Sequence, residues 1–68
     1  MNFEEVERRD RRNYLRHSIK AAEVARAIHM AKLPGDHEYS LSAGALITRL
    51  IGELIDLGGD VRDLEARN

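Results

Sequence analysis

The 68-residue chain has no cysteine, and its only proline is Pro34. Without cysteine there can be no disulfide, and no Cys/His cluster is present to hold a structural zinc. Both are common supports of small folds. A domain of this size buries only about 60% of the surface that its unfolded chain exposes. We therefore expect a marginal core that association with another chain completes.

Long hydrophobic runs are also lacking. The longest purely apolar stretches are a few residues, far below the ~20 that a membrane-spanning helix needs. The first residues, MNFEE, are acidic, whereas a secretory signal begins with basic and then apolar residues. A chain without cysteine is also compatible with a reducing cytosol. These absences predict a cytoplasmic protein with no membrane partner.

The spacing of glycine and proline predicts two helices. Residues 3–32 contain neither and are rich in good helix formers, which predicts one long helix over about 3–32. Pro34 and Gly35 cannot continue it, so we expect a loop over 33–40. We expect a second helix over about 41–57, followed by a short helical tail over 60–67.

Capping residues are expected at both ends of the second helix. Ser40 or Ser42 is the predicted N-cap, and Gly58 with Gly59 is the predicted C-terminal cap. Asp60 is expected to cap the tail. The predicted fold is all-α, a single helix-loop-helix αα-hairpin over residues 1–68 with a short C-terminal helical turn.

The second helix carries more large aliphatic residues than one partner helix can cover. They form two adjacent stripes, wider than the roughly 100° apolar face of an ordinary surface helix. We predict these core or dimer-interface residues: Ile47, Leu50, Ile51, Leu54, Ile55 and Leu57, with Leu46 beside them. We expect the first helix to contribute Leu15, Ile19, Ala22, Val24, Ala25 and Ile28. One stripe can pack internally, and the other predicts a homodimer that resembles a four-helix bundle.

Charge is divided between the two halves. Residues 1–32 hold eight bases and five acids, a net +3, and residues 33–68 hold three bases and seven acids, a net −4. Three acids of residues 4–7 lie four positions before arginines, a spacing that supports a solvated helix. An acidic protein partner and nucleic acid are the alternative interpretations of this arginine-rich segment.

A cleaner basic strip follows the arginine-rich segment. We predict these partner-binding residues: Arg9, Arg12, Tyr14, Arg16 and Lys20. Arginine and tyrosine are enriched at binding hot spots. Two structural alternatives stay open: Arg16 and Lys20 can pair with acids such as Glu53, and Tyr14 can belong to the core.

Candidate catalytic and metal-binding residues are lacking. His17 and His29 would lie about 18 Å apart on one helix and cannot share an ion, and His37 is expected to be a solvated loop residue. No nucleophile, base and orienting group occur at a recognisable spacing, and a hairpin offers little concave volume. We expect no enzyme, no cofactor and no metal.

Surfaces must therefore carry the function, and we expect a small adaptor or inhibitor that acts as a homodimer. In size, lack of cysteine, long first helix and the apolar stripe over 46–57, the chain resembles small phage-encoded helical-hairpin proteins that bind host regulators or motor ATPases. Some of these are anti-activators of quorum-sensing transcription factors. The resemblance implies a phage protein in the host cytoplasm that occludes a larger host protein, such as a transcription regulator. A nucleic-acid-binding helical dimer is the alternative.

Overall fold

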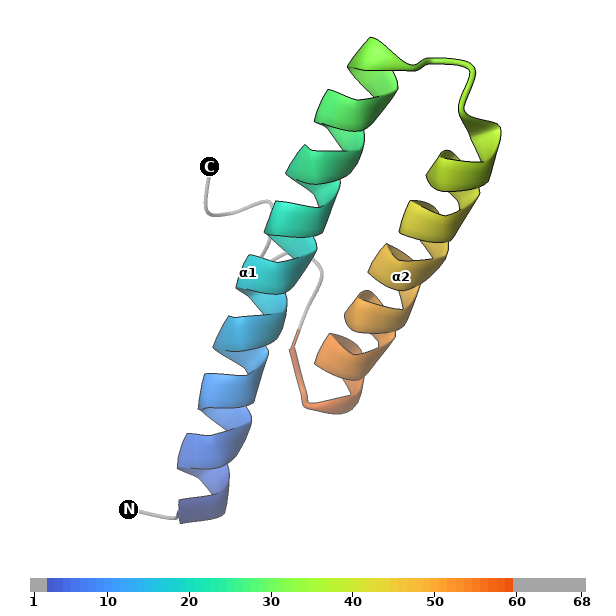
Figure 1. Cartoon of the computed structure of the whole chain (residues 1–68). Helices are drawn as coiled ribbons and strands as arrows, with labels where there is room; N and C mark the ends of the chain where they lie inside the picture. Colours follow the sequence, from blue (N-terminus) through green and yellow to red (C-terminus); the bar gives the residue numbers. More distant parts are fainter. Residues whose placement is uncertain (1–2, 60–68) are drawn as a thin grey trace.

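Two antiparallel α-helices form the hairpin, as Figure 1 shows for the computed structural model. The structure describes residues 3–59, in which α1 spans Phe3–Lys32 and α2 spans His37–Asp56. The all-helical hairpin is confirmed, and the first helix has the predicted bounds. The expected tail over 60–67, with its cap at Asp60, lies outside the described residues.

The connection between the helices is shorter than predicted. It occupies only residues 33–36, because α2 begins at His37 and not near residue 41. The backbone N–H of Leu33 donates to the His29 carbonyl at 2.8 Å, and the N–H of Asp36 donates to the Leu33 carbonyl at 3.0 Å. These bonds turn the chain tightly around Pro34 and Gly35.

Asp36 is the N-cap of α2, so the prediction of Ser40 or Ser42 was wrong. Its Oδ1 accepts the Tyr39 backbone N–H at 3.1 Å, which satisfies one of the free amides of the first turn. Ser40 lies inside the helix, where its N–H donates to the Asp36 carbonyl at 3.1 Å. Its hydroxyl accepts from the Arg26 guanidinium at 2.9 Å.

The C-terminus of α2 has the predicted glycine cap. Gly58 has φ +83°, its N–H donates to the Ile55 carbonyl, and the N–H of Gly59 donates to the Leu54 carbonyl, both at 2.9 Å. This pair of bonds is the Schellman motif. A Cβ on Gly59 would collide with the buried side chain of Leu54. Both glycines are therefore required where the chain leaves the helix.

The core is a narrow seam between the helices. Its buried side chains are Leu15 and Ile19 from α1 and Ile47 and Leu54 from α2. Partly buried hydrophobic residues surround it: Ala22, Leu50, Ile51 and Leu57. Within residues 3–59 the seam thus has four buried side chains, two from each helix.

The N-terminal end of α1 projects beyond the end of α2 (Figure 1). At 1.5 Å per residue, the 30 residues of α1 are about 45 Å long and the 20 residues of α2 about 30 Å. Arg12 reaches Leu57, just past the last residue of α2. Residues 3–10 therefore form an arm that α2 does not cover.

Glycines 58 and 52 provide a matched test of this fold. Gly58→Ala places a side chain at positive φ, and we expect it to lower the free energy of unfolding by about 1–2 kcal/mol. Gly52 lies in the interior of α2, is exposed, and an added Cβ meets no atom within 4 Å. Gly52→Ala should therefore stabilise by about 0.5–1 kcal/mol. Urea unfolding followed by circular dichroism at one protein concentration checks both signs, and equal effects would contradict the cap.

Candidate protein-interaction site

Arg12 from the predicted basic strip binds the end of α2. Its Nη1 donates to the Leu57 carbonyl at 2.8 Å, and its side chain is half-buried. The last carbonyls of a helix have no partner within the helix and carry partial negative charge. Arg12 thus joins α1 to the C-terminus of α2, and its guanidinium is held within the hairpin.

Arg11 makes an ion pair between the helices with Glu53, the acid that we considered from the sequence as a partner of Arg16 or Lys20. Its Nη2 lies 3.4 Å from Glu53 Oε2, with both side chains about half exposed. The guanidinium carbon also lies 5.4 Å from the centre of the Tyr14 ring. Exposed pairs of this kind contribute little to stability, about 0–1 kcal/mol. The Arg11–Glu53 pair and Tyr14 lie on one side of the hairpin. Tyr14 is 61% exposed and so lies outside the core.

The other residues of the predicted strip differ in exposure. Arg16 is half-buried, and its Nη1 donates to Asn13 Oδ1 at 2.9 Å. Lys20 is exposed, and so is Arg9, whose Nε lies 3.9 Å from Asp10 Oδ1. The strip is therefore divided between exposed residues, Arg9, Tyr14 and Lys20, and two half-buried arginines, Arg12 and Arg16.

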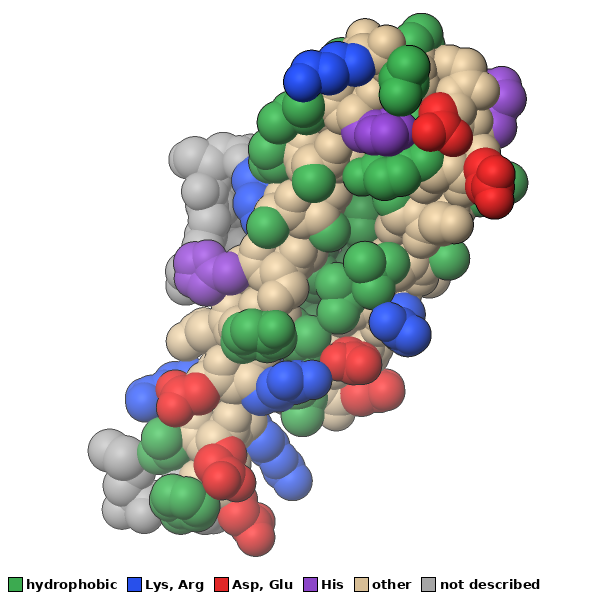
Figure 2. Space-filling model, viewed as in Figure 1, with side chains coloured by type: hydrophobic (Ala, Val, Ile, Leu, Met, Phe, Trp, Pro, Cys, Tyr) green, Lys and Arg blue, Asp and Glu red, His purple; other side chains and the backbone are tan. Residues whose placement is uncertain are grey.

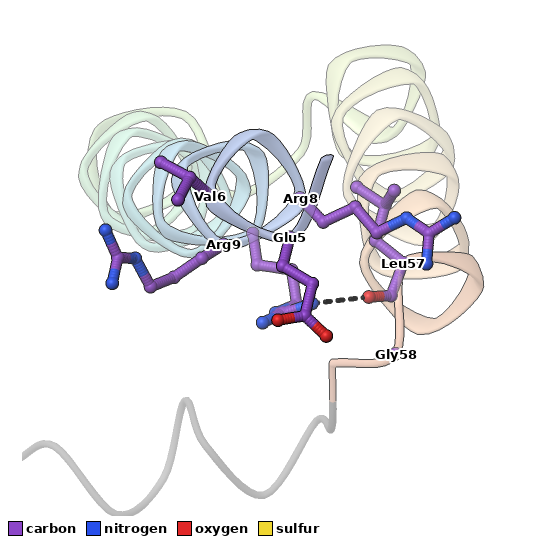
Figure 3. Close-up of a pocket in the computed structure, with 7 residues that line it drawn as sticks. Glu5, Val6, Arg8, Arg9, Leu57 and Gly58 are labelled. Carbon is purple, nitrogen blue, oxygen red and sulfur yellow. Dashed lines mark hydrogen bonds between the residues drawn. The ribbon is translucent and has the colours of Figure 1, made fainter. Parts of the chain in front are cut away.

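A cleft of about 520 Å³ lies between the arm and the end of α2. Its lining is charged and apolar: Glu5, Val6, Arg8, Arg9, Arg12, Leu57 and Gly58. Figure 3 shows Glu5 and Arg8 directed toward the α2 end, whereas Arg9 points away from Leu57. Three arginines against one glutamate make the lining basic, a composition that suits carboxylate groups.

Large hydrophobic side chains are exposed along both helices and in the connection between them. They are Phe3, Tyr14, Val24, Ile28, Leu33, Leu41, Leu46 and Ile55. Val24 and Ile28 were expected to pack on the second helix, and this was wrong. Val24 follows the half-buried Ala22 by two positions, and Ile28 follows the half-buried Arg26 by two positions. A step of two residues is a rotation of about 200° around the helix. Val24 and Ile28 therefore lie on the side of α1 away from α2.

The six interface residues predicted on α2 separate in the same way. Ile47 and Leu54 are buried, and Leu50, Ile51 and Leu57 pack against them. Ile55 is 52% exposed and Leu46 is 41% exposed. One internal stripe is therefore filled, and the surplus residues Leu46 and Ile55 flank it on either side.

The hairpin turn holds a cluster that the sequence analysis missed. His29 Nε2 lies 2.9 Å from Asp36 Oδ2, and the His29 ring stacks on Tyr39 with centroids 3.7 Å apart and a 23° angle between planes. Asp36 also caps α2 through Tyr39. One carboxylate thus connects the last turn of α1 with the first turn of α2. The signal in the sequence was Asp36 just before a helical run, with an aromatic residue three positions later.

The hydrogen bond from His29 lowers the pKa of the Asp36 carboxyl below its ordinary 3.8, and the Tyr39 N–H lowers the pKa further. Because the folded chain holds this carboxylate charged to lower pH than the unfolded chain does, Asp36 stabilises the fold fully above about pH 4. That contribution is lost as the pH falls through the lowered pKa.

Within residues 3–59, no group of three or more histidine, cysteine or acidic side chains is placed to hold a metal ion. In the same region, no helix is both long and apolar enough to cross a membrane. Comparisons with protein-family models, curated proteins and solved structures found no match. The candidate site that we describe consists of the exposed apolar and basic surfaces of the hairpin.

Arg12 and Arg9 allow a matched test on α1. Arg12→Met removes the charged hydrogen bond to the Leu57 carbonyl, and we expect it to lower the free energy of unfolding by about 1–2 kcal/mol. Arg9→Met removes an exposed charge and should change it by no more than about 0.5 kcal/mol. Urea titration measures both. Equal losses would show that Arg12 does not hold the helix end.

Histidines 29 and 37 test the turn cluster. His29→Ala removes the main cause of the lowered Asp36 pKa, so that pKa should rise toward 3.8. His37→Ala removes the weakest cause and should raise it less. Carbon-13 NMR titration of the Asp36 carboxyl in each protein measures the values directly. An unchanged pKa in His29→Ala would contradict the hydrogen bond.

Proposed function

We propose that this chain is a non-enzymatic adaptor or inhibitor that acts as a homodimer and binds a larger protein. The observation that carries the proposal is the balance of apolar side chains. Within residues 3–59, four hydrophobic residues are buried, whereas eight large ones are exposed. A hairpin with more exposed than buried hydrophobic residues has surfaces that association can cover.

The outer side of α1 supports a helix-binding role. Exposed residues recur there at steps of three and four, and we name them the outer stripe: His17, Ala21, Val24, Ile28 and Ala31. This is the heptad spacing with which one helix packs along another. Because the stripe faces away from α2, it is the surface that we assign to the protein partner.

The charges around α1 suit a protein partner more than nucleic acid. Arg11 pairs with Glu53, and Arg12 and Arg16 make hydrogen bonds within the chain. Phosphate binding gains from basic side chains that can neutralise phosphates and release counterions. Arg8 and Arg9 in the arm have the acids Glu4, Glu5, Glu7 and Asp10 as neighbours in the sequence. Nucleic-acid binding is therefore the second candidate.

Inhibition by occlusion is the specific form of the proposal. A helix of about 45 Å can cover a long groove or helix on its target. Phage-encoded hairpins of similar layout cover transcription regulators or ATPases, and we propose a host target of that kind. Contacts of this type require shape and charge, and they need no catalytic group.

Paired substitutions on the two helices test the assignment of the outer stripe. Immobilised protein is exposed to nuclease-treated lysate of the source cells, the retained protein is purified, and its affinity is measured by calorimetry. We expect Val24→Asp with Ile28→Asp to weaken binding at least tenfold, because charges then enter an apolar contact. Leu41→Asp, at a 76% exposed position on α2, should leave the affinity unchanged.

Two controls make this result decisive. Circular dichroism and light scattering must show that the variants stay helical and keep the wild-type molar mass. Recovery of nucleic acid instead of protein when nuclease is omitted, with steep weakening between low and physiological salt, would favour the second candidate. Equal affinity of the wild-type and outer-stripe variants would remove this stripe from the functional account.

A further inference from the structure

One side of the hairpin is marked by two contacts far apart along the helices. Arg11 and His29 are 18 residues apart, five turns of α1, so they point in the same direction. They contact Glu53 and Tyr39, which are 14 residues apart, close to four turns of α2. These four residues therefore bound one face of the molecule at its two ends.

Between these ends the face is mostly apolar, with only small residues on α1 and two leucines on α2. On α1 it contains Ser18, Ala21, Ala22 and Ala25, and on α2 it contains Ala43, Leu46 and Leu50. We call this surface the alanine–leucine face. Figure 2 shows hydrophobic side chains along the groove between the helices, with charged groups toward either end. Leu46 is 41% exposed there and Ala25 is exposed.

The large and small residues lie level with one another. His29 stacks on Tyr39, and seven residues from this pair along each antiparallel helix are Ala22 and Leu46. Both helices rise 1.5 Å per residue, so Ala22 and Leu46 are at the same height. Ser18, Ala21, Ala22 and Ala25 have the i, i+3, i+4, i+7 spacing of a hole that receives one side chain of a facing helix.

We infer that the alanine–leucine face is the self-association interface, and that α1 of one chain lies over α2 of its partner. A two-fold axis parallel to the helices keeps every residue at its height, so Leu46 of each copy enters the alanine hole of the other. The contact is then self-complementary, as a two-fold interface requires. This inference rests on the proposed homodimer and specifies its geometry.

The charges of the two helices favour this arrangement more than one in which α1 of one chain lies on α1 of its partner. Within the described helices, α1 has eight bases and five acids, a net +3, and α2 has one base and three acids, a net −2. Stacking α1 over the partner's α2 places opposite charges together, whereas α1 over α1 places like charges together. The second arrangement would also set alanine against alanine and leave the groove poorly filled.

Light scattering with matched leucine substitutions provides the first test. The wild-type protein should have twice the 7.7 kDa mass of one chain. Leu46→Glu should fall to the single mass and keep its helicity, because Leu46 lies outside the buried core. Leu41→Glu, on another side of α2, should remain a dimer. A wild-type monomer, or a dimer that survives Leu46→Glu, would overturn the inference.

Disulfide trapping tests the orientation, since the chain has no cysteine of its own. Ala25→Cys chains and Leu46→Cys chains are mixed and oxidised with glutathione disulfide, with one carrying a tag that makes it heavier. Mass spectrometry should find mainly the mixed disulfide. Homodisulfides of Ala25→Cys or of Leu46→Cys in excess would indicate α1 over α1 and contradict the arrangement. Ala25→Cys mixed with Leu41→Cys is the background control.

These outcomes separate the interface from the proposed function. A wild-type monomer that still binds its protein partner through the outer stripe would overturn this inference and leave partner binding intact. A trapped Ala25–Leu46 dimer that retains no protein from the lysate would support the interface and contradict the adaptor or inhibitor role.

Discussion

A two-helix hairpin can bury only the side of each helix that faces the other, and this constraint governs the molecule. A helix rotates by 100° per residue, so only every third or fourth side chain can point toward one neighbour. Leu15 and Ile19 meet Ile47 and Leu54 along that line. Every further aliphatic residue must flank the seam or face solvent. The exposed hydrophobic residues are therefore a consequence of having two helices, and in the dimer that we propose a second chain covers part of them.

Because the seam is short, polar contacts at its two ends fix the register of the helices. Arg12 holds the last carbonyl region of α2 at one end, and the His29–Asp36–Tyr39 cluster holds the first turn of α2 at the other. Both contacts use the free groups of a helix end, so they satisfy groups that would otherwise need water. The four buried side chains within residues 3–59 lie at repeating helical spacings, so a shift of one turn would still set aliphatic side chains against one another.

The parts of the fold that depend on local chemistry could be predicted from the sequence, and those that depend on tertiary contact could not. The bounds of α1 follow from the absence of glycine and proline, and the Gly58–Gly59 cap follows from the need for positive φ. The N-cap was misassigned because serine and aspartate cap equally well locally, and His29 across the turn favours Asp36. Val24 and Ile28 share the i, i+4 spacing of Leu15 and Ile19, so periodicity could not show which pair meets α2.

The outer stripe and the alanine–leucine face lie mainly on different sides of α1, and Ala21 is their common edge. In the proposed dimer each chain contributes one outer stripe, and the two-fold axis directs the stripes to opposite sides of the bundle. A single helix-on-helix contact is a small interface, of a size that gives weak binding. Two identical contacts on one rigid dimer would act together on a target that is itself two-fold symmetric, because the second contact forms at high effective concentration. Dimerisation would thus complete a marginal core and raise the avidity of the same molecule.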